Sequence, residues 1–154
     1  MSKRFLLTAA VTLVLFASPR AADAFVNELT VTIGGGAVVE DGKASRLPVS
    51  FELLPSYSLW LFKLDMGFYL AIDKPADFVL RPGFRFGIPL IYFRGGAHLK
   101  VTHGADYGFL AGIGTEPLGF GPVSLVLEID TYLTKDGKLD SIPIEARAGV
   151  SIGF

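Results

Sequence analysis

The sequence contains no cysteine, which excludes a disulfide scaffold, a thiolate metal site and a cysteine nucleophile. Charged residues make up only 19% of its 154 residues, and the net charge of −1 leaves no basic surface for nucleic acid. Beyond the N-terminal segment, no stretch has the hydrophobic period of a helix. Hydrophobic residues nevertheless reach 51%, which is too many for a disordered chain. The remaining possibility is a single domain of β-structure.

The N-terminal segment has the features of a secretory signal peptide. Lys3-Arg4 precedes an apolar run over Phe5–Ala17, and Ala22–Ala24 supplies small residues at a cleavage site. This run is shorter than the roughly 20 residues of a membrane-spanning helix. We therefore expect removal of residues 1–24, which leaves residues 25–154 as the mature domain. A secretory route combined with the absence of cysteine fits the envelope of a Gram-negative bacterium.

The rest of the chain divides into eight runs in which apolar residues alternate with polar or small ones. Most runs are close to the ~10 residues of a tilted membrane-crossing strand, and longer than the usual five or six of soluble strands. Short connections between consecutive runs favour an all-β, eight-stranded antiparallel up-and-down transmembrane β-barrel. The predicted strands are 29–38, 47–54, 58–72, 78–86, 90–102, 107–114, 123–133 and 142–154.

The connections alternate between two kinds, as up-and-down topology requires, because alternate connections lie at the same end. The second, fourth and sixth each contain proline and together carry one charge, Glu116; they are 55–57, 87–89 and 115–122. The other four are rich in charge and glycine; they are 40–46, 73–77, 103–106 and 134–141.

Charged residues share one face of the predicted strands. Successive side chains of a strand point to opposite faces, so residues of equal parity lie together. In five strands the charges all have one parity, which also carries many glycines, and the opposite face is apolar. The residues of the charged face are Glu52, Lys63, Asp65, Arg81, Arg85, Arg94, His98, Lys100, Glu128, Asp130, Glu145 and Arg147.

The size of an eight-stranded barrel decides which face is inside. Its interior is just wide enough for side chains, so it cannot hold the bulky apolar face. The charged face therefore lines the lumen, with five acids and six bases in near balance. Buried charges are costly unless they are paired, so we expect a salt-bridged, closed lumen. We also expect a bulge at Pro82, because it lies in mid-strand and has no N–H.

Aromatic residues gather near one end of two neighbouring hairpins. They are Trp60, Phe62, Tyr92 and Phe93. Aromatic side chains are enriched where a membrane meets water, so these four residues are expected in an interfacial girdle, with packing in an ordinary core as the alternative.

The last strand resembles the C-terminal strand of bacterial outer-membrane barrels, which typically end in Phe after alternating apolar residues. The matching residues are Ala148, Val150, Ile152 and Phe154. With the signal peptide and eight strands, the chain resembles the small OmpA-type and OmpX-type barrels, although its predicted outer loops are shorter. The resemblance implies a place in the outer membrane, among its lipid and lipopolysaccharide. It also implies that the assembly machinery recognises this last strand.

Candidate catalytic groups are few. Glu128, Asp130 and Glu145 are placed to neutralise arginines, or alternatively to do acid–base chemistry. His98 is interpreted as a structural residue of the lumen, with a metal ligand or a general base as the alternative. We therefore expect a structural envelope protein with no enzymatic activity, no metal and no cofactor.

Two other functions stay open. A secreted or periplasmic lipocalin-like barrel would turn the apolar face inward around an apolar ligand, and would be soluble in water. A lipid-modifying outer-membrane enzyme would need a catalytic triad on the lipid face, where the predicted register places no His, Asp or Glu.

Overall fold

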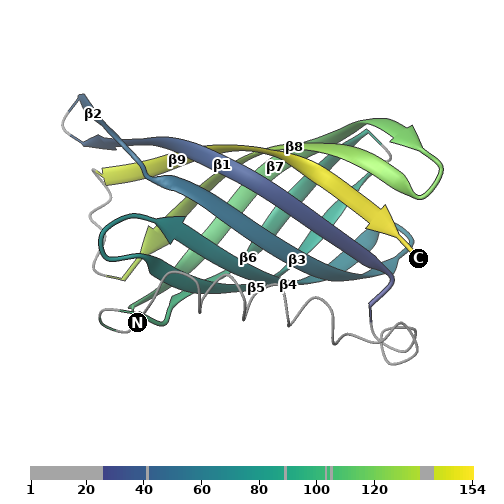
Figure 1. Ribbon diagram of the computed structural model, residues 1–154, viewed down its shortest axis with the longest axis horizontal. Helices are drawn as coiled ribbons and strands as arrows, with labels where there is room; N and C mark the ends of the chain where they lie inside the picture. Colours follow the sequence, from purple (N-terminus) through teal and green to yellow (C-terminus); the bar gives the residue numbers. More distant parts are fainter. Residues whose placement is uncertain (1–25, 41, 89, 103, 105, 136–140) are drawn as a thin grey trace.

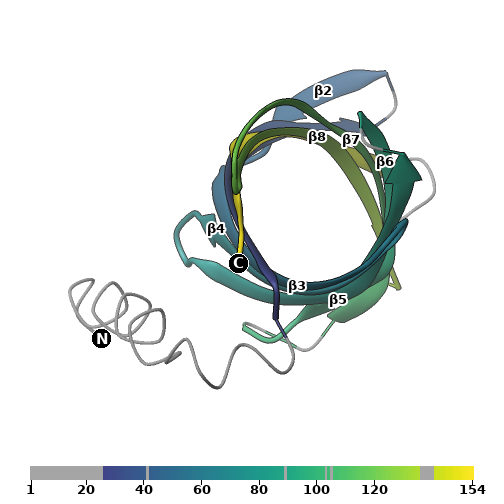
Figure 2. The same cartoon turned by 90° about the vertical axis from the view of Figure 1, so that its right-hand side faces the viewer.

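The computed structural model describes residues 26–40, 42–88, 90–102, 104, 106–135 and 141–154. The predicted signal peptide, residues 1–24, lies outside them. Figure 1 shows one antiparallel sheet, and the view down its axis in Figure 2 shows that it closes into a ring. The strands are β1 (Glu28–Glu40), β2 (Lys43–Arg46), β3 (Val49–Leu59), β4 (Phe62–Ile72), β5 (Asp77–Ile88), β6 (Ile91–Lys100), β7 (Asp106–Phe120), β8 (Val123–Thr134) and β9 (Ser141–Gly153).

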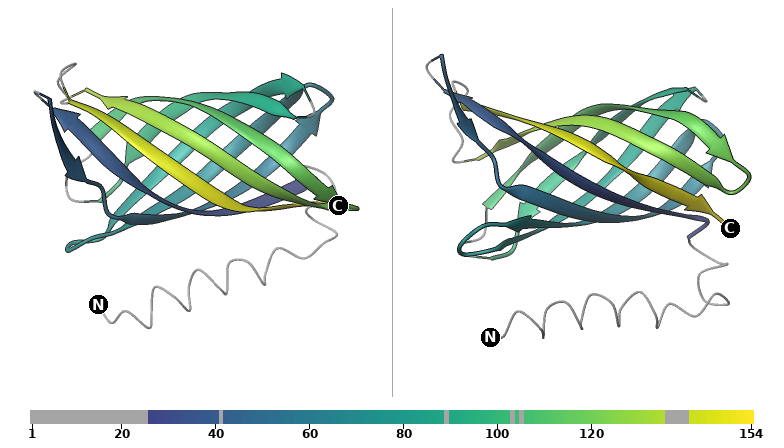
Figure 3. Two further views of the ribbon diagram at one scale, coloured as in Figure 1. Left: turned by 90° about the horizontal axis from the view of Figure 1, so that it is seen from above. Right: turned by 45° about the horizontal axis from the view of Figure 1, so that its top comes forward.

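Eight of these strands form the barrel wall, in the order β1-β3-β4-β5-β6-β7-β8-β9, and β9 pairs back with β1. The predicted eight-stranded antiparallel up-and-down barrel is confirmed. The short strand β2 pairs with Ala37–Glu40 of β1, and this hairpin projects beyond the wall. All strands run obliquely to the barrel axis, as Figure 3 shows in two further views.

The connections lie at two ends of the barrel. One end, which we call the charged end, has the connections β1–β2–β3, β4–β5, β6–β7 and β8–β9. The other, which we call the apolar end, has the turns β3–β4, β5–β6 and β7–β8 together with the C-terminus, at the right of Figure 1. The two kinds of connection in the sequence thus occupy opposite ends.

The predicted connection at Pro55–Tyr57 is wrong. Strand β3 continues through it, and the turn is formed by Trp60 and Leu61, where Trp60 has a left-handed φ of 57°. The predicted strand 58–72 is therefore split in two. Proline is tolerated because pairing with β4 is interrupted beside it and resumes in the same register at Ser56.

The predicted connection at 115–122 is also mostly strand. The register between β7 and β8 shifts between Thr115 and Leu118, and β7 then continues to Phe120. This bulge contains a proline, whose missing N–H suits an irregular position in the ladder. The shift changes the side-chain alternation, so that Glu116 lies toward the lumen while Leu118 is exposed.

The predicted bulge at Pro82 is wrong. The residue pairs between β5 and β6 on either side of Pro82 have one unchanged register. The ladder is interrupted there without an inserted residue, so the side-chain alternation continues along β5. Arg81 and Arg85 consequently point into the same lumen.

The barrel buries polar residues and exposes apolar ones. Among the described residues, sixteen polar or charged side chains are buried, against eight apolar ones including Pro143. Large apolar side chains such as Ile33, Leu64 and Ile129 are exposed on the outer wall. This distribution inverts the usual one of a water-soluble domain. In the described part of the chain, no helix is both long and apolar enough to cross a membrane.

Candidate functional site in the barrel lumen

The structure places every residue of the predicted charged face toward the inside of the barrel. Two lysines lie near its ends, with 23% of the Lys63 side chain and 30% of the Lys100 side chain exposed. The other ten residues are buried: Glu52, Asp65, Arg81, Arg85, Arg94, His98, Glu128, Asp130, Glu145 and Arg147.

A central cluster of ion pairs crosses the lumen between β3, β6, β8 and β9. Arg94 Nη2 lies 2.6 Å from Glu52 Oε1, and its Nη1 lies 2.7 Å from Glu128 Oε1 and 3.3 Å from Asp130 Oδ2. Arg147 Nη2 lies 3.0 Å from Glu52 Oε2. Glu52 therefore joins two arginines, and the cluster ties opposite walls of the barrel together.

Arg81 and Glu145 extend the network toward the charged end. Arg81 Nη2 lies 3.5 Å and Arg147 Nη1 3.4 Å from Glu145 Oε2. The hydroxyl groups of Ser50 and Tyr69 donate to Glu145 Oε1. The Arg81 guanidinium lies 3.7 Å from the centroid of the Tyr69 ring, in cation–π geometry. Hydroxyl and aromatic groups thus supply contacts that water would otherwise make.

His98 belongs to this part of the network. Its Nδ1 accepts a hydrogen bond from Arg81 Nε at 3.3 Å, and its ring stacks on Tyr132 with centroids 4.2 Å apart. The imidazole therefore serves as a hydrogen-bond acceptor and a packing surface. Within the part of the chain that the structure describes, it is not among the side chains that converge closely enough to hold a metal ion.

A second cluster lies nearer the apolar end. Arg85 Nε lies 3.0 Å from Asp65 Oδ2, and its Nη2 lies 3.0 Å from Glu28 Oε1. Lys63 Nζ lies 2.7 Å from Glu28 Oε2 and 3.0 Å from Glu116 Oε1. Sequence reasoning missed both glutamates. Glu28 has the lumen parity of β1 but preceded the predicted strand, and Glu116 fell in a predicted connection.

These additions change the charge balance that the sequence suggested. At the charged end a third acid, Asp77, lies 2.9 Å from Lys100 Nζ. With Glu28, Glu116 and Asp77 included, acids outnumber bases along the lumen, in contrast to the expected near balance. The difference arises because all three acids lay at or outside the ends of predicted strands.

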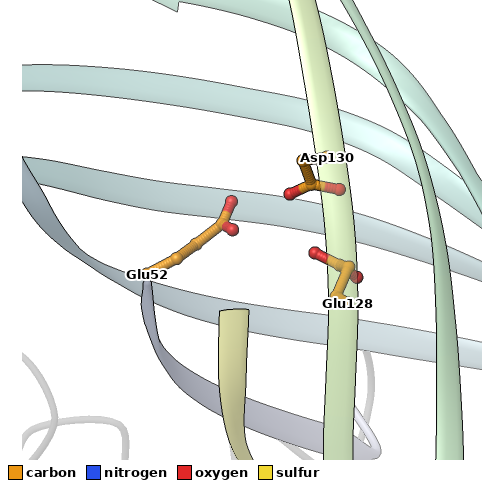
Figure 4. A group of neighbouring side chains, drawn as sticks. All are labelled: Glu52, Glu128 and Asp130. Atoms are coloured by element: carbon orange, nitrogen blue, oxygen red, sulfur yellow. The ribbon is translucent and has the colours of Figure 1, made fainter. Parts of the chain in front are cut away.

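Three carboxylates converge in the central cluster, those of Glu52, Glu128 and Asp130 (Figure 4). One oxygen of each lies within 4.8 Å of the others, which is a spacing that a hard cation can use. Arg94 hydrogen-bonds to all three, and Arg147 Nη1 approaches Asp130 to 3.9 Å. The guanidinium groups already occupy the place of a cation, so the donor set does not fit a metal site.

No protein-family model matches the sequence, and no curated protein is significantly similar to it. Solved structures do match. The N-terminal barrel domain of Pseudomonas aeruginosa OprF is 13% identical, with a TM-score of 0.58, over 84% of this chain and 99% of that one. Ail, the attachment invasion locus protein of Yersinia pestis, is 14% identical, with a TM-score of 0.57 and the same coverages. Neisserial surface protein A is 14% identical, with a TM-score of 0.51, over 82% of this chain and 96% of that one.

The chain has the fold of the small outer-membrane β-barrels. The resemblance that its last strand suggested is thus confirmed at the level of the fold. At these identities the likeness extends to the architecture alone, so the role of this outer-membrane-type barrel must be argued from its own residues.

The outer wall of this outer-membrane-type barrel carries aromatic side chains at the apolar end. The rings of Phe62 and Phe86 lie 4.7 Å apart, and Trp60 is 93% exposed. The predicted place of Tyr92 in the girdle is wrong, because this residue is buried and its hydroxyl donates to Glu128 at 2.8 Å. The exposed aromatic residues of this end include Tyr57, Trp60, Phe62, Phe86, Phe93, Phe120 and Phe154.

The residues of the predicted assembly signal lie on the outer face of β9 and at the chain end. Ala148, Val150, Ile152 and Phe154 are all exposed there. The backbone N–H of Phe154 donates to Asn27 O at 3.0 Å, which fixes the last residue beside the start of β1.

Glycines make room for the lumen charges. A Cβ on Gly67 would overlap Glu52 Oε1 and lie 2.9 Å from the Arg81 Cβ, and a Cβ on Gly112 would overlap Asp130 Oδ1. The small residues of the charged face are therefore part of the ion-pair geometry.

Gly67→Ala is expected to lower the free energy of unfolding by about 1–3 kcal/mol, because the added methyl group must displace Glu52 or Arg81. Gly35→Ala is the matched control, since its Cβ would meet no described atom within 4 Å. Urea unfolding in detergent micelles measures both changes. Equal losses in the two variants would contradict the packing role of Gly67.

Proposed function

We propose that this chain is an integral protein of the bacterial outer membrane, with a structural role in the envelope and a lumen closed by its ion pairs. The observation that carries the proposal is the inverted burial, with charged side chains inside and large apolar ones outside. A closed barrel is also one of only two architectures that satisfy every backbone polar group within lipid.

The length of the wall strands supports a membrane-crossing role. The shortest wall strand, β6, has 10 residues. At ~3.3 Å per residue and a tilt of ~45°, such a strand spans about 23 Å, close to the apolar band of about 25 Å in outer-membrane barrels. The aromatic residues at the apolar end fit one boundary of this band.

The lumen supports a structural rather than a catalytic role. The carboxylates of Glu52, Glu128 and Glu145 each engage at least one arginine. Such carboxylates are held as partners for guanidinium groups and are poorly placed to act on a substrate. We propose that the pairs form a plug whose main contribution is to join strands across the barrel.

The same orientation of the wall indicates which molecules contact the barrel. We propose that outer-membrane lipid and lipopolysaccharide contact the apolar wall, and that the assembly machinery recognises the exposed side chains of β9 ending at Phe154. Export through a cleaved signal peptide of residues 1–24 completes this route. The lipocalin-like alternative is not favoured, because it requires an apolar lining where the lumen is charged.

Refolding tests the proposal directly. Residues 25–154 are diluted from urea into detergent micelles and, separately, into buffer alone, and are compared by gel mobility with and without boiling and by circular dichroism. We expect a β-rich, heat-modifiable band only in micelles, because the apolar wall needs a lipid-like solvent. A soluble β-rich monomer in plain buffer would refute the membrane assignment.

A further inference from the structure

A hollow of about 190 Å³ opens at the apolar end of the lumen. Lys63 and Arg85 contribute cationic groups to it, and Glu116 contributes a carboxylate. The remaining lining includes Trp60 and Ile88, which are exposed apolar residues at the end of the wall. The hollow therefore combines positive charge with an apolar margin.

One nitrogen of the Arg85 guanidinium lacks a hydrogen bond in this hollow. Arg85 is 1% exposed, and its Nη1 is buried without a hydrogen-bond partner among the described residues. The nearest acid oxygen to Nη1 among its ion pairs is Glu116 Oε1, at 3.8 Å. The same oxygen lies 3.0 Å from Lys63 Nζ. Glu116 thus lies near both cations, but it is within hydrogen-bond distance of Lys63 Nζ only.

The backbone that carries Glu116 lacks the ladder pairs that the preceding residues of β7 make with both neighbouring strands. The last residue of β7 that pairs with β6 is Thr115, opposite Ile91. Pairing with β8 is interrupted after Thr115 and resumes at Leu118. Glu116 therefore lies in a bulge with no ladder partner on either side, where a small backbone movement can withdraw its carboxylate.

We propose that this hollow binds a phosphate group and that the Glu116 carboxylate occupies the site when no ligand is bound. Lys63 and the free Nη1 of Arg85 would donate to the phosphate oxygens, as charge-assisted hydrogen bonds. Glu28 and Asp65 keep Lys63 and Arg85 paired throughout, so the exchange of Glu116 for another anion leaves neither cation uncompensated. The apolar margin at Trp60 and Ile88 fits a phosphate carried by a lipid. This site goes beyond the structural role proposed above.

The Glu116 carboxylate competes with a phosphate group for the same two cations, and this competition lowers the affinity expected for the ligand. A tethered group acts at an effective concentration in the millimolar range or above, so it weakens the binding of a free ligand to the same place. Glu116→Gln removes the competing charge and retains the side-chain shape. We expect this substitution to lower the dissociation constant for a phosphate-bearing ligand at least about tenfold.

The only tryptophan of the chain lines the hollow, so its fluorescence reports on occupancy. The wild type, Glu116→Gln and the control Glu40→Gln are folded in maltoside micelles at constant ionic strength. Each is titrated with sodium phosphate, with dihexanoyl phosphatidylglycerol and with dihexanoylglycerol, which lacks phosphate. Glu40 is an exposed acid at the charged end, so its substitution controls for net charge.

Tighter binding of a phosphate-bearing probe to Glu116→Gln alone, and its loss on adding Lys63→Gln, would support the site. Equal binding of sodium phosphate and the phospholipid would identify free phosphate as sufficient, whereas binding of the phospholipid alone would identify a headgroup. Unchanged affinity in Glu116→Gln, an equal change in Glu40→Gln, or equal binding of dihexanoylglycerol would overturn the proposal. Heat-modifiable mobility of each variant separates these outcomes from a failure of the barrel to fold.

Discussion

Arg94→Met is expected to destabilise the folded barrel by about 3–5 kcal/mol, because it leaves buried carboxylates without their cation. Arg94 is buried, and it lies within 3.0 Å of oxygens of both Glu52 and Glu128. Methionine fills much of the same volume, so the expected loss comes mainly from uncompensated charge. The free energy of unfolding in urea, measured in detergent micelles, gives its size.

Two further variants separate charge from packing at this position. Lys43→Met removes a cation from the exposed strand β2 and is expected to change stability by less than about 0.5 kcal/mol. Adding Glu128→Gln to Arg94→Met removes one of the buried carboxylates left unpaired and should restore part of the lost stability. If Arg94→Met costs no more than Lys43→Met, the central cluster does not stabilise the barrel.

Ile129→Arg is expected to lower stability in lipid vesicles by about 2–4 kcal/mol, the cost of arginine near the midplane on the lipid face of a barrel. Ile129 is 53% exposed and lies in the middle of β8, opposite Ile113 of β7 and Ala146 of β9. An arginine there cannot reach the lumen acids, because its side chain points away from them. Urea unfolding in phosphatidylcholine vesicles measures the loss.

The depth dependence of this cost is the sharper test. Ile142 is exposed on the outer wall near the charged end of β9, and Ile142→Arg is expected to cost only about 0–1 kcal/mol because arginine can reach the interface there. In a water-soluble barrel both arginines would be exposed to water and both changes would be small. Equal costs at the two positions would therefore contradict a membrane-embedded wall.

Side-chain alternation placed the charged residues on one face, and the narrow interior of an eight-stranded barrel predicted that this face points inward. Glu128 and Asp130 share one parity of β8, as Glu145 and Arg147 do on β9, and the structure turns each pair into the lumen. The same rule applies to Tyr92, which has the parity of Arg94 and is buried beside it. Tyr92 was assigned to the girdle because it is aromatic, although its parity is that of the inward residue Arg94.

The strand ends were less predictable, because proline was interpreted as a turn signal. Pro55 and Pro117 both lie within strands, where the ladder is interrupted beside them and their missing N–H is tolerated. Glu116 continues the inward parity of Gly114 but lay beyond the end of the predicted strand, and the bulge that contains Pro117 then places Leu118 on the outer face. Such positions are set by the pairing of neighbouring strands.

The sequence does not predict which charged residues pair with each other across the lumen. Glu52 on β3 meets Arg94 on β6 because the barrel closes with a particular stagger between its strands. Alternation gives the face of each residue but not its height relative to the opposite wall. The height of each residue is set only when every strand of the wall is paired in its final register, which places Glu52 level with Arg94.

The pairing of β1 with β9 has a consequence for the order of folding. The seam runs from Glu28 opposite Gly153 to Glu40 opposite Ser141, so it joins the two ends of the barrel domain. Arg147 donates across it to Thr32 at 2.9 Å. Such contacts form only after the last strand is present, and a loop of this length closes slowly. Until then both edge strands present unpaired backbone, so the nascent sheet requires protection until its final residues arrive.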